Sequence, residues 1–352
     1  MDYQLFLEIL EKTRHHRDDQ FLEIEVPYNG TMGLIHLKNA ELLLGDDDLM
    51  SKGIFSFGRG GQLIIGQGYT TAQQVTDALQ HITDTLRTHN RIKPITLDNP
   101  VEYARIVREW DDRPWNEIKD HTPVCDSATL QALGFPRFNC HCVALKVING
   151  QVHIVFGERG EGTYAGEWDN AIGGKMEAEK TRDENMQSET GQETKLKVTI
   201  DGKINSPLYL GTIYTLRQKD KSIFNRHISV YLWLMKPDDI PQPNDEVMHF
   251  HTLPFDSFMD YLRDPAQASR FPYFVPLDVF YAVAKYLKTE YENGTLNGDG
   301  MLLNGQSIRL LNLVIDEAES APTLIGTGHA TLDFIDSVGE RLAKISKPAY
   351  GR

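Results

Sequence analysis

The sequence predicts an α+β protein in which a mixed sheet lies between helices, preceded by a small mixed α/β domain. Three observations carry this prediction. Beyond residue 125, stretches with the alternation of strands are interspersed with stretches of helical periodicity. Residues 227–235 are apolar on both alternating faces, which indicates a central strand covered on both sides. Before residue 120, short strand patterns and an amphipathic helix pattern predict a separate module.

The first 120 residues contain local signals but no chemical motif. Residues 21–26 alternate like a strand, and residues 53–57 and 62–66 predict a β-hairpin around a glycine-rich turn. Thr71 is predicted to cap a helix, because apolar residues follow it at helical spacing. These apolar positions are Val75, Leu79, Ile82 and Leu86. Residues 2–16 also show helical spacing. We therefore predict a mixed α/β domain over residues 1–120.

The elements beyond residue 120 define the larger predicted domain, residues 125–290, with a boundary region at 120–126. Predicted strands are 139–148, 152–156, 168–172, 208–215 and 227–235, with a turn at Asn149-Gly150. Predicted helices are 181–190, 255–262 and 279–288, the first of them ended by Gly191. Residues 291–352, broken repeatedly by Asn-Gly and Gly-Asp pairs, are predicted to be a partly helical extension.

Composition and charge limit the function. The formal charge of −14 argues against binding nucleic acid or an anionic membrane, because phosphates need Lys and Arg to neutralise them. The three cysteines, Cys125, Cys140 and Cys142, have neither disulfide nor zinc spacing. The N-terminal residues lack the basic and apolar regions of a signal peptide, and no apolar run could span a membrane. We expect a cytoplasmic protein, with no prediction of its protein partners.

The most informative stretch begins at Gly173-Gly174 and ends at Thr190-Gly191. It resembles the Nudix box, the motif of hydrolases that cut diphosphates linked to another group, which reads G-x5-E-x7-R-E-U-x-E-E-x-G-U, where U is bulky and apolar. When the match is anchored on Thr190-Gly191, its loop is four residues short and the R-E-U-x-E-E helix reads as residues 184–189. The resemblance implies a Nudix-type α/β/α sandwich and a metal-dependent diphosphate hydrolase.

The residue types of this helix bear directly on metal binding. Side chains at i, i+3 and i+4 share a helix face, so three glutamates there could bind Mg²⁺ through oxygen. In this alignment the face carries Asn185, Ser188 and Glu189, with Glu184 adjacent, and two of three carboxylates are lost. We therefore predict that Mg²⁺ (or Mn²⁺) binds weakly. Glu177, Glu179 and Glu184 are possible substitute ligands.

Other stretches resemble one Nudix subgroup, the proteins labelled thiamine-pyrophosphokinase-related, which place a domain of unknown function before the Nudix domain. Residues 133–141 look like its F-G-x-x-x-Y-G-x-H segment, residues 163–170 are similar to T-x-P-G-x-x-D-N, and residues 241–247 look like P-x-P-n-D-G-E-V. Some members of the subgroup hydrolyse damaged thiamine diphosphates to monophosphates. The resemblance therefore implies a small-molecule diphosphate as substrate, with thiamine diphosphate as one possibility.

The candidate site combines these motifs. Glu189 is the first candidate for metal binding and catalysis, and Glu246 is a candidate general base from outside the box. His141 should point away from Cys140 and Cys142 because neighbouring strand residues alternate. The predicted substrate-binding residues are His141, Arg159, Asp169, Gly173 and Gly174. Two functions remain open: a diphosphate hydrolase, and a Nudix-fold module that binds a diphosphate ligand or a partner without catalysis.

Overall fold

The computed structural model describes residues 21–59, 61–96, 102–105, 122–149, 151–160, 165–201, 206–219 and 222–254. These residues fall into two compact units. The first contains the described residues up to Phe138 together with Lys175–Thr181 and Leu216–His227, and the second contains the remainder. The elements predicted at 2–16, 255–262 and 279–288, and the extension from 291, lie outside the described residues. The domain limits 1–120, 125–290 and 291–352 therefore stay a prediction.

The first unit contains a four-stranded mixed sheet in the order β2-β1-β4-β3. Strand β1 pairs antiparallel with β2 and parallel with β4, and β3 pairs antiparallel with β4. A second, two-stranded sheet joins β5 and β6. The elements are β1 (Phe21–Val26), β2 (Thr31–His36), α2 (Leu37–Leu44), α3 (Asp47–Ser51), β3 (Phe55–Phe57), β4 (Leu63–Ile65), α4 (Ala72–Thr88), β5 (Tyr103–Arg105), β6 (Val124–Asp126) and α6 (Ser127–Ala132).

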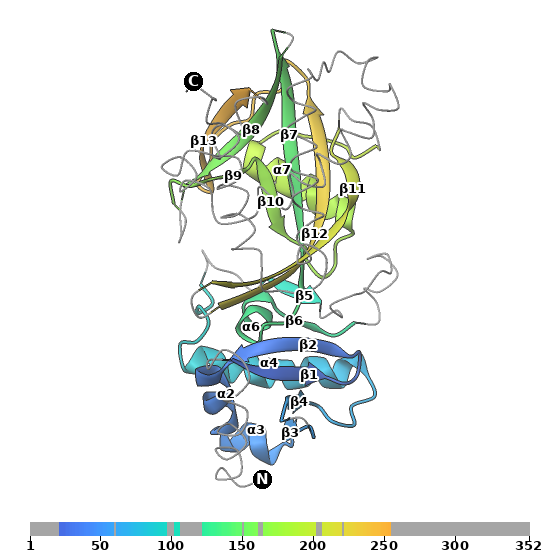
Figure 1. Ribbon diagram of the computed structural model, residues 1–352, viewed down its shortest axis with the longest axis vertical. Coiled ribbons are helices and arrows are strands. Elements are labelled where there is room, and N and C mark those ends of the chain that lie inside the picture. Colours follow the sequence, from blue (N-terminus) through green and yellow to red (C-terminus); the bar gives the residue numbers. More distant parts are fainter. Residues whose placement is uncertain are drawn as a thin grey trace, which may run out of the picture. The chain divides into compact units, whose positions relative to one another are not determined.

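Helix α4 follows its sequence signals closely. The Thr71 side chain accepts from the Gln74 N–H, and the Gln74 side chain returns to the Thr71 backbone, which forms a capping box. The predicted apolar stripe from Val75 to Leu86 is fully buried. It joins the apolar side chains of β1 and β4 in one core, and Figure 1 shows α4 along the four-stranded sheet. The predicted helix, strand β1 and the glycine-linked hairpin are confirmed.

The second unit is built on a seven-stranded sheet in the order β11-β12-β7-β8-β13, with β10 paired to β7 and β9 to β8. Figure 1 shows helix α7 behind strands β7 and β10. The elements are β7 (Arg137–Ile148), β8 (Gln151–Arg159), β9 (Trp168–Asn170), β10 (Ile172–Lys175), α7 (Arg182–Thr194), β11 (Leu208–Lys219), β12 (Ser222–Met235) and β13 (Val247–Pro254). The α+β class with mixed sheets and helices, predicted from the sequence, is confirmed.

The predicted central strand and the predicted turn at Asn149 both occur in the structure. Residues 227–235 are buried on both faces, and β12 lies between β11 and β7, so the central strand is confirmed. The predicted turn is confirmed by Asn149 at φ 51°, between antiparallel β7 and β8. Strand β6 begins at Val124, within the segment 120–126 that the sequence predicts as a boundary region. Within the described residues, no helix is both long enough and apolar enough to cross a membrane.

The predicted end of the box helix is wrong. Helix α7 passes through Gly191 and continues to Thr194, and Lys195 then adopts φ 59°, the left-handed conformation that ends many helices. The carbonyls at this end are satisfied by another segment: the Gln242 N–H donates to Thr194 O at 2.9 Å, and Asn244 Nδ2 donates to Glu193 O at 2.6 Å. Gly191 therefore has no role in ending the helix.

Lys195→Gly is expected to raise the free energy of unfolding by roughly 0.5–1 kcal/mol. Glycine adopts positive φ without the steric cost that a Cβ imposes, although part of this gain is offset by the greater freedom of glycine in the unfolded chain. Equilibrium urea unfolding measures the change. Lys197→Gly is the matched control, since Lys197 is also exposed but has no positive φ, and it should be neutral or destabilising. Equal effects of the two substitutions would contradict this explanation.

Candidate functional site

The candidate site is built around Gly173 and Gly174 of strand β10. A Cβ on Gly173 would overlap the ring of His141, and a Cβ on Gly174 would overlap the carboxylate of Glu189. Only glycine therefore allows both neighbours to approach this closely. His141 Nδ1 lies 3.1 Å from Asn170 Oδ1, while the neighbouring Cys140 faces α7. The predicted alternation of His141 with its flanking cysteines is confirmed.

Helix α7 brings two carboxylates to these glycines. Glu189 lies against Gly174, and Glu193 Oε2 accepts a hydrogen bond of 2.6 Å from the Gly173 N–H. The two residues are four apart, so they occupy one face of the helix. The arrangement places two carboxylates against a stretch of backbone that carries no side chains of its own.

Other contacts fix the orientation of α7. At its start, Tyr231 Oη donates to Asp183 Oδ1 at 2.6 Å, and the Arg182 guanidinium lies 3.8 Å from the centre of the Tyr209 ring. At its end, Asn244 Nδ2 binds the carbonyls of α7, while Asn244 Oδ1 accepts from the N–H groups of Glu246 and Val247. The turn that carries Glu246 is thereby attached to the end of the helix that carries Glu193.

The site is strongly acidic. Glu193 retains some exposed surface, but its carboxyl lies deep among neighbouring atoms. Burial raises the pKa of this carboxyl well above its ordinary value, and the charge of Glu189 raises it further, followed by those of Asp169 and Glu246. The hydrogen bond from Gly173 opposes this rise. A cation at Glu189 and Glu193 would relieve the repulsion between the two carboxylates.

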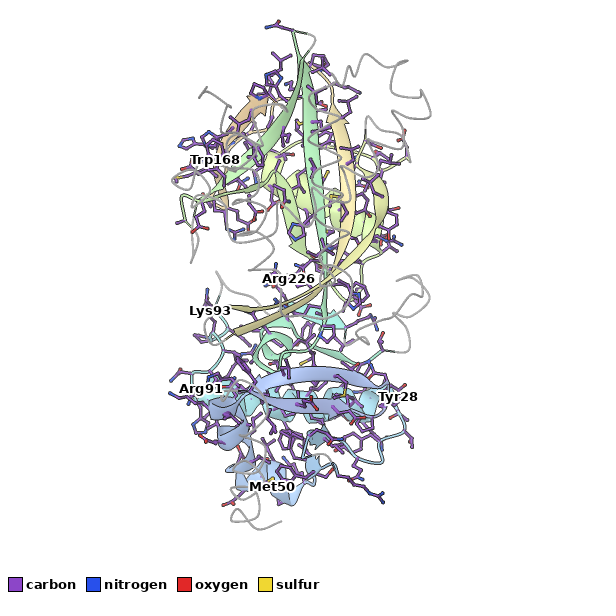
Figure 2. All side chains as sticks on the ribbon, in the orientation of Figure 1. Tyr28, Met50, Arg91, Lys93, Trp168 and Arg226 are labelled. Atoms are coloured by element: carbon purple, nitrogen blue, oxygen red, sulfur yellow. The ribbon has the colours of Figure 1, made fainter. Side chains whose placement is uncertain are left out.

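The predicted Arg159 and Asp169 form an ion pair at the edge of the sheet. Arg159 Nη1 lies 3.3 Å from Asp169 Oδ2, and Asp169 Oδ1 also accepts from the Asn170 N–H. Next to this pair, the rings of Trp168 and His251 stack with centres 3.8 Å apart, and His251 Nε2 lies 2.6 Å from Glu158 Oε2. Figure 2 shows the position of Trp168 in the unit. These contacts join β8, β9 and β13.

The remaining predicted ligands do not share one surface. Asn185 is fully buried, and its side-chain nitrogen donates to Cys140 Sγ at 3.6 Å. Glu184 and Ser188 line a surface hollow with Gln187, Gly191, Gln192 and Lys195. Glu177 pairs with Lys180 and Glu179 with Arg105, both within the first unit. Asn185, Ser188 and Glu189 therefore do not lie together, whereas Glu189 and Glu193 both lie against the glycine strand.

This geometry also suggests a second alignment to the Nudix pattern. If Gly174 is the first glycine and Glu193 the last glutamate, the pattern fits with its full loop length and without the four-residue gap. Thr190, at the first apolar position, is fully buried, and Lys195 has the left-handed backbone that suits the final glycine. In this alignment Lys180 stands at the loop glutamate, Ser188 at the arginine and Lys195 at the final glycine. The three helix glutamates of the pattern correspond to Glu189, Gln192 and Glu193.

The residues fit a divalent cation only in part. In the described part of the chain, no three His, Cys, Asp or Glu side chains form a ready metal site. Two carboxylates are nevertheless enough for Mg²⁺ when water and substrate phosphates supply the other ligands. The three cysteines are buried and free, and burial raises the pKa of all three thiols, so they do not compete as thiolate ligands at neutral pH.

Sequence reasoning missed Glu193 and Asn244. Gly191 resembled a helix stop, which excluded Glu193 from the helix. A signal for Glu193 was present, since it lies at i+4 from Glu189, and Leu196 supplies the apolar residue that ends the pattern. Asn244 lies within the Pro-rich segment 241–247, which was recognised only for its similarity to the subgroup. Its contacts to α7 depend on tertiary structure and left no local signal.

Comparisons with known proteins give similarities to solved structures alone. No family model matches the chain, and no curated protein matches it. A MutT/nudix family protein from Enterococcus faecalis is 16% identical, with a TM-score of 0.27, over 33% of this chain and 43% of that chain. An Ap4A hydrolase from C. elegans in a binary complex is 11% identical, with a TM-score of 0.32, over 44% and 98%. The NUDIX domain of Shewanella oneidensis NrtR, complexed with ADP ribose, is 12% identical, with a TM-score of 0.32, over 43% and 88%.

The extent of these similarities is small. The chain spans less than half of the Enterococcus faecalis protein, and every TM-score is well below 0.5.

Proposed function

We propose that this chain is a Nudix-like hydrolase of a diphosphate linked to an organic group. The observation that carries the proposal is the placement of Glu189 and Glu193 against the backbone of Gly173-Gly174, at the spacing of the Nudix pattern. Two carboxylates on one face of a helix suit a divalent ion that also coordinates the phosphates of a ligand.

Glu189 and Glu193 would hold Mg²⁺ or Mn²⁺, bound more weakly than by three glutamates because Gln192 replaces the third. The ion, when bound, would neutralise the diphosphate and activate a water. Glu246 is the proposed general base, since its segment is attached to the end of α7 by Asn244. Arg159, held by Asp169, is the proposed phosphate contact, and His141 is proposed to border the substrate beside Gly173.

The substrate class follows from two arguments. A diphosphate needs cationic compensation, which this acidic site can provide only through metal ions and Arg159. The resemblance of segments 133–141, 163–170 and 241–247 to the thiamine-pyrophosphokinase-related subgroup supports thiamine diphosphate and its damaged forms as the first compounds to assay. The described residues contain no membrane-spanning helix, and the net charge of −14 continues to argue against nucleic acid.

Two observations favour the alternative, a Nudix-fold module that binds a diphosphate ligand or a partner without catalysis. Gln192 stands where the re-aligned pattern has a glutamate, and the described residues form no three-ligand metal site. A module of this kind would retain the glycine backbone and Arg159 for binding, and it would lack the metal charge needed for hydrolysis.

Glu189→Gln is expected to lower diphosphate hydrolysis by about a hundredfold or more, because the substitution keeps size and hydrogen bonding but removes a charge that the metal needs. The assay uses thiamine diphosphate, oxidised thiamine diphosphate, ADP-ribose and diadenosine tetraphosphate, with Mg²⁺ and then Mn²⁺. Glu184→Gln is the matched control, since Glu184 is exposed on another face of the same helix.

The outcomes separate the two functions. Loss of turnover in Glu189→Gln with turnover retained in Glu184→Gln supports the hydrolase. Turnover that survives Glu189→Gln removes this residue from the mechanism. If the wild-type protein binds a compound of the panel but does not cleave it, the binding module is the correct function.

A further inference from the structure

The first unit contains a cavity that the proposed hydrolase function does not use. It has a volume of about 390 Å³, which lies within the usual range for small-molecule sites. Every residue that lines it belongs to the first unit. Phe21 and Leu34, from strands β1 and β2, and the buried Ile92 form an apolar part of its wall.

The charges around this cavity oppose the charge of the whole chain. Its lining includes two carboxylates, Glu102 and Asp126, and five basic side chains. The basic side chains are Arg87, Arg91, Lys93, Arg137 and Lys175. Five positive charges and two negative charges give a local formal charge of +3, in a protein whose formal charge is −14. A concave site with this local charge attracts small anions.

Two of the five cations are already paired. Arg87 forms an ion pair with Asp126, and Lys175 forms one with Glu102. Within the described residues, Arg91, Lys93 and Arg137 have no carboxylate within ion-pair distance. Arg91 and Lys93 follow the C-terminal end of α4, and Figure 2 labels both. Three positive charges therefore remain available to a ligand.

Arg137 is the most unusual of the three. Its side chain lines the cavity and is only 3% exposed, and within the described residues its side-chain hydrogen bond is a long one, 3.4 Å, to Ser127 Oγ. Burial lowers the pKa of the Arg137 guanidinium to about 9. The nearby charge of Arg226 lowers this pKa further and that of Glu102 raises it, so Arg137 is still charged at neutral pH. A buried cation with no carboxylate within ion-pair distance is costly, and a bound anion would reduce that cost.

We propose that this cavity binds a small organic phosphate, with its phosphate between Arg137, Arg91 and Lys93 and its organic part against Phe21, Leu34 and Ile92. Arginine suits this task because its planar fork of N–H groups matches the oxygens of a phosphate. The apolar wall favours an ester of phosphate over the inorganic ion. The site needs no metal and shares no residue with the proposed hydrolase site, so the two proposals stand independently.

Isothermal titration of the full chain tests the site, with adenosine monophosphate, inorganic phosphate and adenosine as probes. The buffer contains EDTA, which prevents metal-dependent binding at Glu189 and Glu193. Adenosine monophosphate should bind more tightly than inorganic phosphate, and adenosine should not bind. The combined variant Arg91→Glu with Lys93→Glu should weaken adenosine monophosphate at least about tenfold, because it reverses two charges at exposed positions that do not support the fold.

The controls match the charge and test the fold. Lys38→Glu with Arg59→Glu makes the same change of charge at exposed positions of the first unit outside the cavity, and it should change the affinity less than about twofold. Arg137→Gln should also weaken binding at least tenfold, provided that circular dichroism shows an unchanged fold. Glu189→Gln should leave this binding intact.

Three results would overturn the proposal. One is the absence of binding of either phosphate compound to the wild-type chain. The second is equal affinity of adenosine and adenosine monophosphate. The third is unchanged affinity in the Arg91→Glu and Lys93→Glu variant. Loss of hydrolysis in Glu189→Gln with phosphate binding retained would support both proposals separately.

Discussion

Glu193→Gln is expected to lower metal-dependent diphosphate hydrolysis by about a hundredfold or more and to weaken Mg²⁺ binding in isothermal titration. Glu193 is the second carboxylate that α7 places against the glycine strand, with its Oε2 2.6 Å from the Gly173 nitrogen. An amide can accept the same hydrogen bond from Gly173, but it contributes no charge to a cation beside Glu189. The loss should therefore appear in metal binding and turnover and not in the fold.

Unfolding experiments separate this explanation from a structural one. Because burial raises the pKa of the Glu193 carboxyl, the charged form is disfavoured in the folded chain, and the neutral glutamine should maintain or increase stability at pH 7. Glu177→Gln, at an exposed ion pair with Lys180, is the control and should retain turnover. Full activity in Glu193→Gln would show that Glu193 is not a metal ligand. Loss of activity together with a lower free energy of unfolding would show that its role is structural.

The parts of the fold that local patterns determine were predictable. Thr71 and the apolar stripe that follows it define α4, and the apolar faces of residues 227–235 define a central strand, since both depend on neighbours in sequence. Strand β2 and helices α2 and α3 were not predicted from the sequence. Gly33 occupies a buried position of β2, where a Cβ would overlap the Phe135 side chain and the Leu133 carbonyl from a distant part of the sequence. That contact exists only after folding.

The sequence predicted one part of the candidate site and missed another. The glycines of β10 and Glu189 are visible in the sequence because the motif has short, fixed spacing. The extent of the helix was misjudged, since glycine usually marks a helix end and Gly191 does not. Here the helix continues because Asn244 and Gln242 satisfy its last carbonyls, and because Lys195 accepts a left-handed backbone. Those contacts determine which carboxylates face the glycines.

The two alignments of the box helix predict opposite results for two sets of substitutions. If the helix is read as residues 184–189, Asn185→Glu with Ser188→Glu restores the missing metal ligands. In the structure Asn185 is fully buried against Cys140, so a glutamate there would instead lower the free energy of unfolding by about 2–4 kcal/mol. Improved Mg²⁺ binding by this double variant would contradict the alignment that places the helix pattern at residues 188–193.

Gln192→Glu is expected to tighten Mg²⁺ binding by about tenfold or more, because it adds a third carboxylate at i+3 from Glu189 and next to Glu193. Gln192 is exposed, so the substitution has little structural cost. Isothermal titration with Mg²⁺ measures the affinity, and the diphosphate assay measures whether turnover rises with it. Gln187→Glu adds the same charge to the same surface hollow, but at i−2 from Glu189, a spacing at which helix side chains do not face each other, and it should have less than a twofold effect. Equal gains in the two variants would mean that general electrostatics, and not a ligand position, explains the effect.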